Sequence, residues 1–487
     1  MDILQILTSS AWSVLMIAVF FGGSIFLHEL GHFWVAKKRG VKVERFSIGF
    51  GPAIFKWVGK DGVEYRLSWL PLGGYVALPQ LADMRGLEGE PSAETQALPS
   101  PNYTTRMLVF GAGAFMNVVF AFALATILWK VGMPANADTQ RAKIGHVAAT
   151  LTLPDGREVP SPAAEAGLRP GDTIAAIDGN RVTTWDEMRQ MLFTGAGRAS
   201  DGRPLAELTV LRDGQTMTLT ALPVLAGDER MRMLGVSPYQ DLKVAEIAPD
   251  SLAARAGLQV GDLVRSLDGV AVTSIATYVT ALEADPKKPS ALVVERAGET
   301  VALTVPPRAD AKTAADLGVG FDPEIILIHP SPWKQISDTA RMTFRTFWSL
   351  LHHDSDVGIS KLSGPVGIAR VFHITAQADI RLVLWFTILV NVNLAIFNLL
   401  PLPVLDGGHM LFATIGRLRG KPLPAGFIQT AQSAFVVLLL CMMVYVTFFD
   451  VRRIARDVAP AKAESEAPAA PEPATSESAE PAPTPAP

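Results

Sequence analysis

Residues 26–32 read Phe-Leu-His-Glu-Leu-Gly-His and lie inside an apolar run from Trp12 to Ala36. That run is near the roughly twenty residues that a helix needs to cross the hydrocarbon core of a bilayer. Histidines four residues apart lie on nearly the same face of an α-helix, so both imidazoles can reach one metal ion, and Glu29 lies beside them. Ionisable groups inside an apolar span are costly to insert and indicate a functional site. The segment therefore predicts a membrane helix in which His28 and His32 hold a metal.

Three further apolar runs have similar length, at Met107–Val131, Arg381–Leu400 and Gly426–Phe449. Hydrophobic residues make up 49% of the 487 residues and charged residues only 18%, which favours a membrane protein. No basic region precedes the first run and no small-residue cleavage pattern follows it, so we interpret it as a permanent span rather than a signal peptide. The net charge of −4 comes without a basic block and predicts no nucleic-acid partner. A single cysteine, Cys441, excludes an internal disulfide.

Lysine and arginine placement predicts the orientation of the spans. No Lys or Arg precedes the first span, whereas Lys37, Lys38 and Arg39 follow it at once. The N-terminus is then expected outside, with residues 37–106 and the end of the first span on the cytoplasmic side. The region between the second and third spans is expected outside as well. Three arginines after the fourth span do not fit this scheme, namely Arg452, Arg453 and Arg456.

An internal repeat lies between the second and third spans. Residues 163–179 read AAEAGLRPGDTIAAIDG and residues 253–269 read AARAGLQVGDLVRSLDG, 90 residues further on. Each copy predicts a short helix closed by a glycine, a Gly-Asp turn, an apolar strand and an Asp-Gly hairpin. The copies resemble PDZ domains of the bacterial, protease-associated kind, over 141–226 and 237–308. The resemblance implies grooves that bind peptide ligands by strand addition, or else a spacer or size filter without a peptide.

A candidate third metal ligand lies at the end of the third span, where residues 398–409 read NLLPLPVLDGGH. Pro401 and Pro403 cannot continue a helix, so the backbone must break there and open a polar spot at membrane depth. Asp406 can supply an oxygen ligand and His409 a nitrogen ligand. Coordination preference alone does not separate these two residues.

Taken together, the HExxH segment in the first span, N-x-x-P-x-P-x-x-D-G in a late span and PDZ-like copies between them resemble the site-2 protease family. The resemblance implies Zn²⁺ held by His28, His32 and Asp406, with Glu29 as the catalytic base. It implies a substrate contact for Asn398, for which a cap on the broken helix is the alternative. Residues 363–367, SGPVG, resemble a family stretch ahead of the third span and predict a tightly turned loop.

Strands are expected after the first span. Phe46, Ile48 and Phe50 alternate with other residues, and the apolar residues of 63–69 alternate with Glu64, Arg66 and Ser68, which predicts a half-buried strand. Gly73, Gly74 and Tyr75 follow. In the family such strands dip into the membrane beside the active site and hold an unwound substrate. The alternative is a cytoplasmic hairpin without substrate contact.

The expected fold is a polytopic α-helical membrane protein with four transmembrane helices, a membrane-associated β-hairpin region and two inserted PDZ domains. Its parts are 1–136 with the first two spans and the strands; 141–226 and 237–308, the PDZ domains; 333–457 with an amphipathic helix at 333–351, the last two spans and the third ligand; and 458–487, a disordered Pro/Ala/Glu tail. The amphipathic helix lies either on the membrane surface or against the soluble domains.

The resemblance implies an endopeptidase that cuts single-span membrane proteins of the anti-sigma factor type within the bilayer of the bacterial inner membrane, with remnant signal peptides as a further candidate class. The PDZ domains are then periplasmic. Two alternatives are an inactive relative that binds membrane proteins through its PDZ grooves, and a metal transporter. The complete ligand set with Glu29 disfavours the first. The lack of further polar residues along a path disfavours the second.

Overall fold

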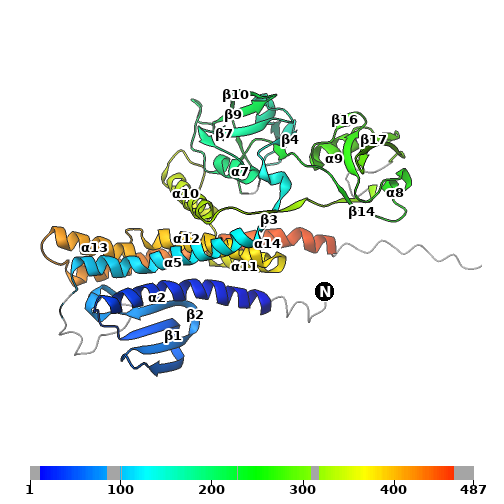
Figure 1. Ribbon diagram of the computed structural model, residues 1–487. Coiled ribbons are helices and arrows are strands. Elements are labelled where there is room, and N and C mark those ends of the chain that lie inside the picture. The colour runs from blue at the N-terminus through cyan, green and yellow to red at the C-terminus, as the bar shows by residue number, and fades with distance from the viewer. Residues whose placement is uncertain (1–10, 85–98, 100, 228, 309–316, 466–487) are drawn as a thin grey trace, which may run out of the picture.

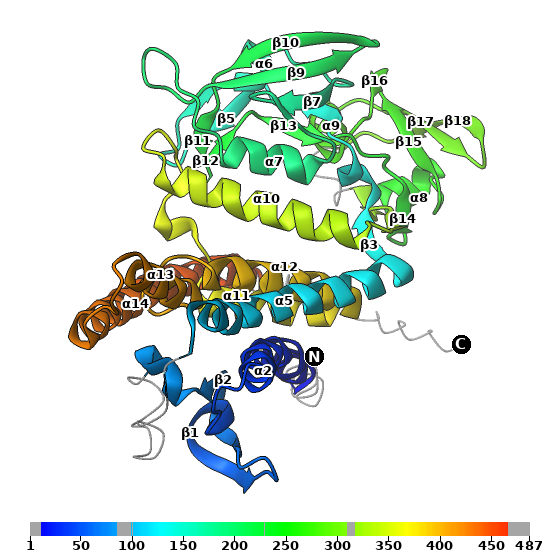
Figure 2. The same cartoon turned by 60° about the vertical axis from the view of Figure 1, so that its left-hand side comes forward.

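The computed structural model describes residues 11–84, 99, 101–227, 229–308 and 317–465 (Figure 1). A layer of long helices lies in the middle, with a β-sheet on one side of it and two small α/β domains on the other (Figures 1 and 2). Residues 466–487 of the predicted tail lie outside the described residues, whereas the disorder predicted for 458–465 is wrong, because these residues are helical. The long helix α14 runs on to Ser465, past the expected start of that tail at residue 458.

Four helices are long and apolar enough to cross a membrane, at Ala11–Lys38, Tyr103–Val131, Ile380–Asn398 and Ala425–Arg456. They coincide with the four predicted spans, which confirms those spans by length and composition. The helices of this layer are the π-turn η1 (Ile17–Phe21), α2 (Gly22–Lys38), α5 (Tyr103–Val131), α11 (Pro365–Ala378), α12 (Ile380–Asn398), α13 (Asp406–Leu418) and α14 (Ala425–Ser465).

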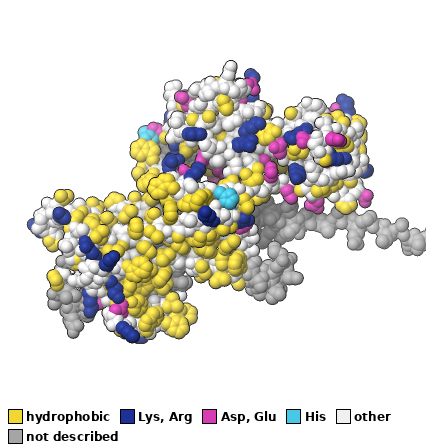
Figure 3. Space-filling view, in the orientation of Figure 1, with side chains coloured by type: hydrophobic (Ala, Val, Ile, Leu, Met, Phe, Trp, Pro, Cys, Tyr) yellow, Lys and Arg dark blue, Asp and Glu magenta, His cyan; other side chains and the backbone are white. Residues whose placement is uncertain are grey.

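Helix α5 is the centre of the helical layer and packs on both α2 and α12. Its buried face is rich in small residues, including Ala112, Gly113 and Ala114, which let backbones approach closely. From α2, a Cβ on Gly31 would strike the carbonyl oxygen of Ala112. Hydrophobic side chains gather over the outer surface of the helices and the β-sheet, while charged ones are spread over the α/β domains (Figure 3). An apolar outer surface of this kind is compatible with contact with the lipid bilayer.

The β-sheet is formed by β1 (Arg45–Val58) and β2 (Glu64–Ala77), each of which bends and pairs twice. Residues 45–48 pair with 64–67 on one side and with 74–77 on the other, and 53–58 pair with 64–68. The paired segments therefore run in the order 53–58, 64–68, 45–48 and 74–77. Because 74–77 pairs only with 45–48 among the described residues, it is an edge of the sheet. Gly74 of this edge lies against α2, since a Cβ on it would lie 2.9 Å from Glu29 Cγ.

The predicted alternation of buried and exposed residues over 63–69 is wrong in its second half. Leu67 is 39% and Trp69 is 69% exposed, whereas Ser68 is 4% exposed and faces Ser47 across the sheet. Register shifts along β1–β2 break the simple two-residue period. Trp57, stacked on Tyr65, is exposed as well, so this part of the sheet presents apolar side chains outward.

The two α/β domains share one plan. The first contains β4 (Ile144–Val147), β5 (Thr150–Thr152), β6 (Glu158–Pro160), α6 (Pro162–Glu165), β7 (Thr173–Ile177), β8 (Asn180–Arg181), α7 (Trp185–Phe193), β9 (Ala206–Arg212), β10 (Gln215–Ala221), β11 (Val224–Ala226), β12 (Met231–Met233) and β13 (Val236–Pro238). The second contains β14 (Val244–Ile247), α8 (Leu252–Ala256), β15 (Leu263–Leu267), β16 (Val270–Ala271), α9 (Ile275–Ala284), β17 (Ser290–Arg296), β18 (Glu299–Val305) and β19 (Val319–Phe321). Their sheets have the orders β10-β9-β7-β8 and β18-β17-β15-β16.

Matched polar contacts hold the equivalent turn in each domain. Asp172 accepts hydrogen bonds from the Arg212 guanidinium, which also donates to the Gly167 carbonyl (2.7 Å). Arg296 makes the same contacts with Asp262 and with the Gly257 carbonyl (2.9 Å). Both glycines have left-handed backbone, with φ of 77° and 81°. The repeated sequence thus builds the same turn twice.

Helix α10 (Pro332–Leu351) lies between the helical layer and the first α/β domain (Figure 2). Thr343 donates to Asn393 of α12 (2.5 Å), and Gln335 donates to the Ala125 carbonyl of α5 (3.2 Å). On another side, Arg345 donates to Thr194 of the first domain (2.6 Å). The helix therefore packs against both the membrane helices and a soluble domain. The strand pair β3 (Met133–Asn136) and β20 (Ile325–Ile328) joins the domains to the helical layer.

Two of the three arginines that did not fit the charge rule, Arg453 and Arg456, make specific contacts. Arg453 donates to the carbonyls of Ser360 (2.5 Å) and Leu362 (3.2 Å), and Arg456 donates to Glu229 of the first domain (2.7 Å). Their placement on α14 is therefore explained by contacts with the segment before α11 and with the first domain.

The tight loop predicted at 363–367 is wrong from Pro365 on, where α11 begins, and the start of that helix contacts Asp450 of α14. Asp450 is 2% exposed and accepts from the backbone N–H groups of Gly364 (2.9 Å) and Gly367 (2.8 Å) at the start of α11. A Cβ on Gly364 would lie 2.9 Å from its Oδ2, and one on Gly367 would lie 3.0 Å from its Oδ1. Glycine at both places lets a carboxylate from another helix cap α11.

Candidate metal centre

The predicted ligands come from two helices, α2 and α13, and the first residue of α13 lies beside α2. Helix α2 carries His28, Glu29 and His32, with both histidines on its buried face. Helix α12 ends at Asn398, the proline-containing segment turns, and α13 begins at Asp406. The turn is tight, because a Cβ on Gly407 would strike the carbonyl oxygen of Leu399. This break carries Asp406 to the two histidines, more than 370 residues from them in sequence.

Three ligand atoms converge on one point. The Nε2 atoms of His28 and His32 lie 3.1 Å apart, and Asp406 Oδ2 lies 3.4 Å and 3.5 Å from them. Ligands at about 2.0–2.1 Å in a tetrahedron around zinc are separated by roughly 3.3–3.4 Å, so these spacings fit one zinc ion. Asp406 Oδ2 is buried without a hydrogen-bond partner, as a metal-ligating oxygen would be. Among the described residues, these are the only three His, Cys, Asp or Glu residues grouped closely enough to hold a metal.

A cavity of about 160 Å³ opens onto these atoms. It is lined by His28, Glu29, His32, Gly74, Tyr75, Val76, Leu78, Leu81, Phe110, Asn398, Val404, Leu405 and Asp406. Most of its wall is apolar, and its polar side chains are the ligands, Glu29, Tyr75 and Asn398. The cavity therefore places a carboxylate, a metal-binding cluster and the edge segment 74–77 around one small space.

Most of the predicted site residues meet in this cavity. Asn398, Gly74 and Tyr75 line it together with Glu29 and the three ligands, whereas Gly73 is not among its lining residues. His409 is 3% exposed and stacks on Phe110, with ring centroids 5.1 Å apart, outside the metal-binding group. The structure thus groups Asp406, rather than His409, with the two histidines.

Three residues of α5 that we did not predict support the histidines. The Nδ1 atom of His32 lies 2.7 Å from the Val109 carbonyl oxygen, and that of His28 lies 3.1 Å from Asn117 Nδ2. Between them, a Cβ on Gly113 would lie 2.6 Å from His28 Cε1 and would strike His32 Nε2. Asn117 is a polar residue inside a predicted span, and that signal could have identified it.

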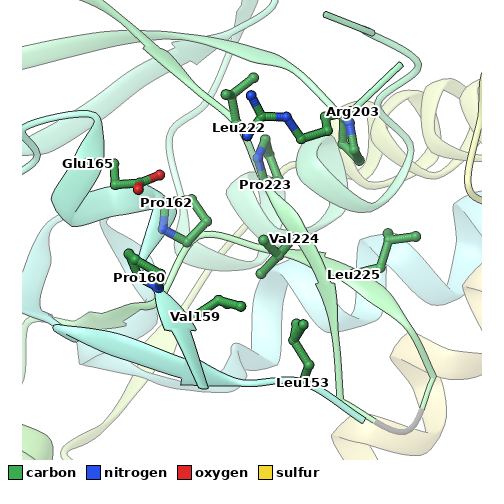
Figure 4. Close-up of a pocket in the computed structure, with 11 residues that line it drawn as sticks. Leu153, Val159, Pro160, Pro162, Glu165, Arg203, Leu222, Pro223, Val224 and Leu225 are labelled. Carbon is green, nitrogen blue, oxygen red and sulfur yellow. The ribbon is translucent and has the colours of Figure 1, made fainter. Parts of the chain in front are cut away.

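A larger cavity, about 370 Å³, lies in the first α/β domain beside β6 and β11 (Figure 4). Its wall is mainly proline, leucine and valine, and Glu165 and Arg203 are its ionisable lining residues. It has no grouping of metal ligands, so the chemistry belongs to the smaller cavity.

Comparison with known proteins agrees with this geometry. The sequence profile of peptidase family M50 matches residues 16–442. The chain is 31% identical over 472 residues to the regulator of sigma-E protease RseP of Escherichia coli. This alignment covers 92% of the chain and 100% of that protein. The protein of the same name from Salmonella typhimurium is 32% identical over 469 residues, with the same coverage. A Vibrio cholerae protein named as a candidate zinc metalloprotease is 31% identical over 480 residues, again covering 92% and 100%. The chain therefore belongs to peptidase family M50, the site-2 proteases, and is a zinc metalloprotease.

Proposed function

We propose that this protein is an intramembrane endopeptidase in which His28, His32 and Asp406 hold zinc and Glu29 is the general base. The observation that carries the proposal is the convergence of three ligand atoms, 3.1–3.5 Å apart, in a cavity that Glu29 also lines. Because the histidines lie in the second half of a helix able to span a membrane, the bond that is cut must reach the site at membrane depth.

Glu29 is the group that moves protons in this proposal. When bound, zinc polarises a carbonyl and lowers the pKa of a water molecule. The Glu29 carboxylate takes the proton as the water attacks the peptide carbonyl, and then gives it to the leaving nitrogen. Segment 74–77 approaches this side chain closely, since a Cβ on Gly74 would lie 2.9 Å from Glu29 Cγ.

The segment 74–77 is the proposed binding edge for the substrate. A helical substrate hides its amide bonds in its own hydrogen bonds and must be extended to be cut. The edge 74–77 pairs on one side only among the described residues, and Gly74, Tyr75 and Val76 line the cavity. An extended segment can therefore add to this edge and lie against the metal site. In this arrangement Asn398 contacts the substrate near the bond that is cut.

We propose further that the two α/β domains are PDZ domains on the periplasmic side of the bacterial inner membrane, with the metal site toward the cytoplasm. The shared strand order and the matched Asp–Arg turns support two copies of one fold. In the second domain Tyr278 of α9 and Phe321 of β19 are in edge contact, with centroids 5.2 Å apart. Tyr278 belongs to the buried core of this domain and Phe321 packs against that core, so the contact fixes β19 to the domain.

The proposed substrates are single-span membrane proteins of the anti-sigma factor type, with remnant signal peptides as a second class. The similarity to proteases named as regulators of sigma E supports the first class.

Cleavage of a single-span model substrate by the wild-type chain and by Glu29→Gln tests the activity. We expect wild-type cleavage and loss of cleavage in Glu29→Gln with zinc retained. Equal cleavage by both, or no cleavage by a zinc-loaded wild type, would contradict the proposal. The second outcome would favour an inactive, membrane-protein-binding relative.

Zinc content tests the ligands separately. We expect His28→Ala and Asp406→Ala to lose stoichiometric zinc and His409→Ala to retain it. Retained zinc in Asp406→Ala together with loss in His409→Ala would reverse the assignment of the third ligand.

A further inference from the structure

One face of α5 contacts the imidazole rings of both His28 and His32. Val109, Gly113 and Asn117 are spaced by four residues and therefore follow one another along the same face of the helix. Val109 and Asn117 each reach the Nδ1 atom of one histidine, and Gly113 leaves room between them for the rings. With Nδ1 of each ring held from α5, the two Nε2 atoms face Asp406.

The partner of Nδ1 decides which nitrogen carries the proton. A neutral histidine that gives its Nε2 lone pair to a metal must carry its proton on Nδ1, so its Nδ1 partner must accept a hydrogen bond. For His32 this condition is met, because the Val109 carbonyl oxygen can only accept. For His28 the partner is the amide of Asn117, which has both a donor end and an acceptor end.

The Asn117 side chain is wholly buried, and its Oδ1 atom has no hydrogen-bond partner. Its Nδ2 end lies 3.1 Å from His28 Nδ1, which is the pairing for a proton on Nε2. A half-turn about the last side-chain bond exchanges the two ends of an amide without changing its shape. The same contact then offers Oδ1 as the acceptor for the Nδ1 proton, which is the pairing that a metal on Nε2 requires.

We propose that Asn117 is a positioning residue for the metal site, whose amide oxygen accepts the Nδ1 proton of His28 and keeps the Nε2 lone pair directed at the metal. This inference rests on the proposed ligand set. It assigns a role to a residue of the second span that touches neither substrate nor metal. Removal of an outer hydrogen-bond partner of this kind lowers metal affinity by about 10–100-fold.

Three variants separate an acceptor role from simple packing. Asn117→Asp keeps the shape of the side chain, and its ionised carboxylate can only accept the hydrogen bond from His28 Nδ1. Asn117→Leu keeps a similar side-chain volume but has no hydrogen-bond acceptor. Asn391→Leu is the matched control, because Asn391 is also a wholly buried amide between helices, donating to Ser24 of α2 (2.8 Å) without touching either histidine.

The measurements are zinc affinity, from competition with a chromophoric chelator in detergent, and the melting temperature of the zinc-free protein. We expect Asn117→Leu to bind zinc about 10–100-fold more weakly than the wild type, Asn117→Asp to bind at least as tightly as the wild type, and Asn391→Leu to keep wild-type affinity. Wild-type affinity in Asn117→Leu would overturn the inference.

Should Asn117→Leu fail to fold, Asn117→Asp decides alone, and zinc binding weaker than in the wild type would refute the acceptor role. Weak binding in both leucine variants would also refute it, because loss of any buried amide would then suffice. A wild-type chain without stoichiometric zinc would instead contradict the proposed ligand set, so the two failures are distinguishable.

Discussion

Substitution of Gly113 by alanine should have opposite effects on the stability of α5 and on the space that α5 leaves for the imidazole rings of His28 and His32. Alanine in a helix interior is ordinarily more stabilising than glycine by about 0.5–1 kcal/mol. At Gly113, however, the added Cβ would lie 2.7 Å from His28 Nε2 and 2.6 Å from His28 Cε1, and would strike His32 Nε2. The methyl group would therefore occupy the space in which both imidazoles lie.

The size of the effect follows from these distances. Ordinary van der Waals contact begins near 3.4 Å, so the His28 ring or the helix must move by at least about 0.8 Å. Metal–ligand distances tolerate only about 0.2 Å. Displacement of an active-site group by about 1 Å can cost on the order of 10²-fold in rate. We therefore expect Gly113→Ala to weaken zinc binding by roughly tenfold or more and to lower the cleavage rate by about 10²-fold.

The assay compares Gly113→Ala with Gly111→Ala, two residues away on the same helix, where an added Cβ meets nothing within 4 Å. Zinc affinity, cleavage rate and melting temperature are measured for both. Gly111→Ala should keep wild-type zinc affinity and rate, with an equal or higher melting temperature. Zinc affinity and cleavage in Gly113→Ala equal to those of Gly111→Ala would refute the reasoning, since the rings would then have room to move without cost.

Three further perturbations test other parts of the structure. Gly407→Ala should reduce zinc content, because its Cβ would strike the Leu399 carbonyl and displace Asp406, whereas Gly426→Ala, with open space around it, should not; equal zinc in both would contradict this. Asp450→Ala should lower the free energy of unfolding by about 1–3 kcal/mol for each N–H group of α11 left without an acceptor, and Asp450→Asn by less; a melting curve unchanged in both would contradict the cap. Burial alone would raise the pKa of Asp356, but hydrogen bonds from Arg198 and Arg232 hold that pKa below its ordinary value of 3.8. The wild type should therefore melt above Asp356→Asn at pH values above 3.8 and lose this advantage as the pH falls below that value; a difference independent of pH would argue against the charge contribution.

The sequence by itself determined the features that depend on local period and composition. Hydropathy located the four spans, because a helix must satisfy its backbone within one continuous apolar segment. The four-residue spacing of His28 and His32 predicted that both would face one way. The repeat predicted two domains with equivalent turns, since the Gly-Asp turn and its capping glycine are set by neighbouring residues.

Only the tertiary structure decided what depends on contacts between distant segments. Asp406 and His409 are both plausible ligands by chemistry, and the packing of α13 against α5 places the first beside His28 and His32 and the second on Phe110. Alternation over 63–69 predicted the wrong burial for Leu67 and Trp69, because register shifts in the sheet and an apolar outer surface override the two-residue period. In the sequence Asn117 is a polar residue in an apolar span, and only the packing of α5 against α2 places it beside His28. Local rules fix which face a side chain occupies, but only helix packing determines what that face meets.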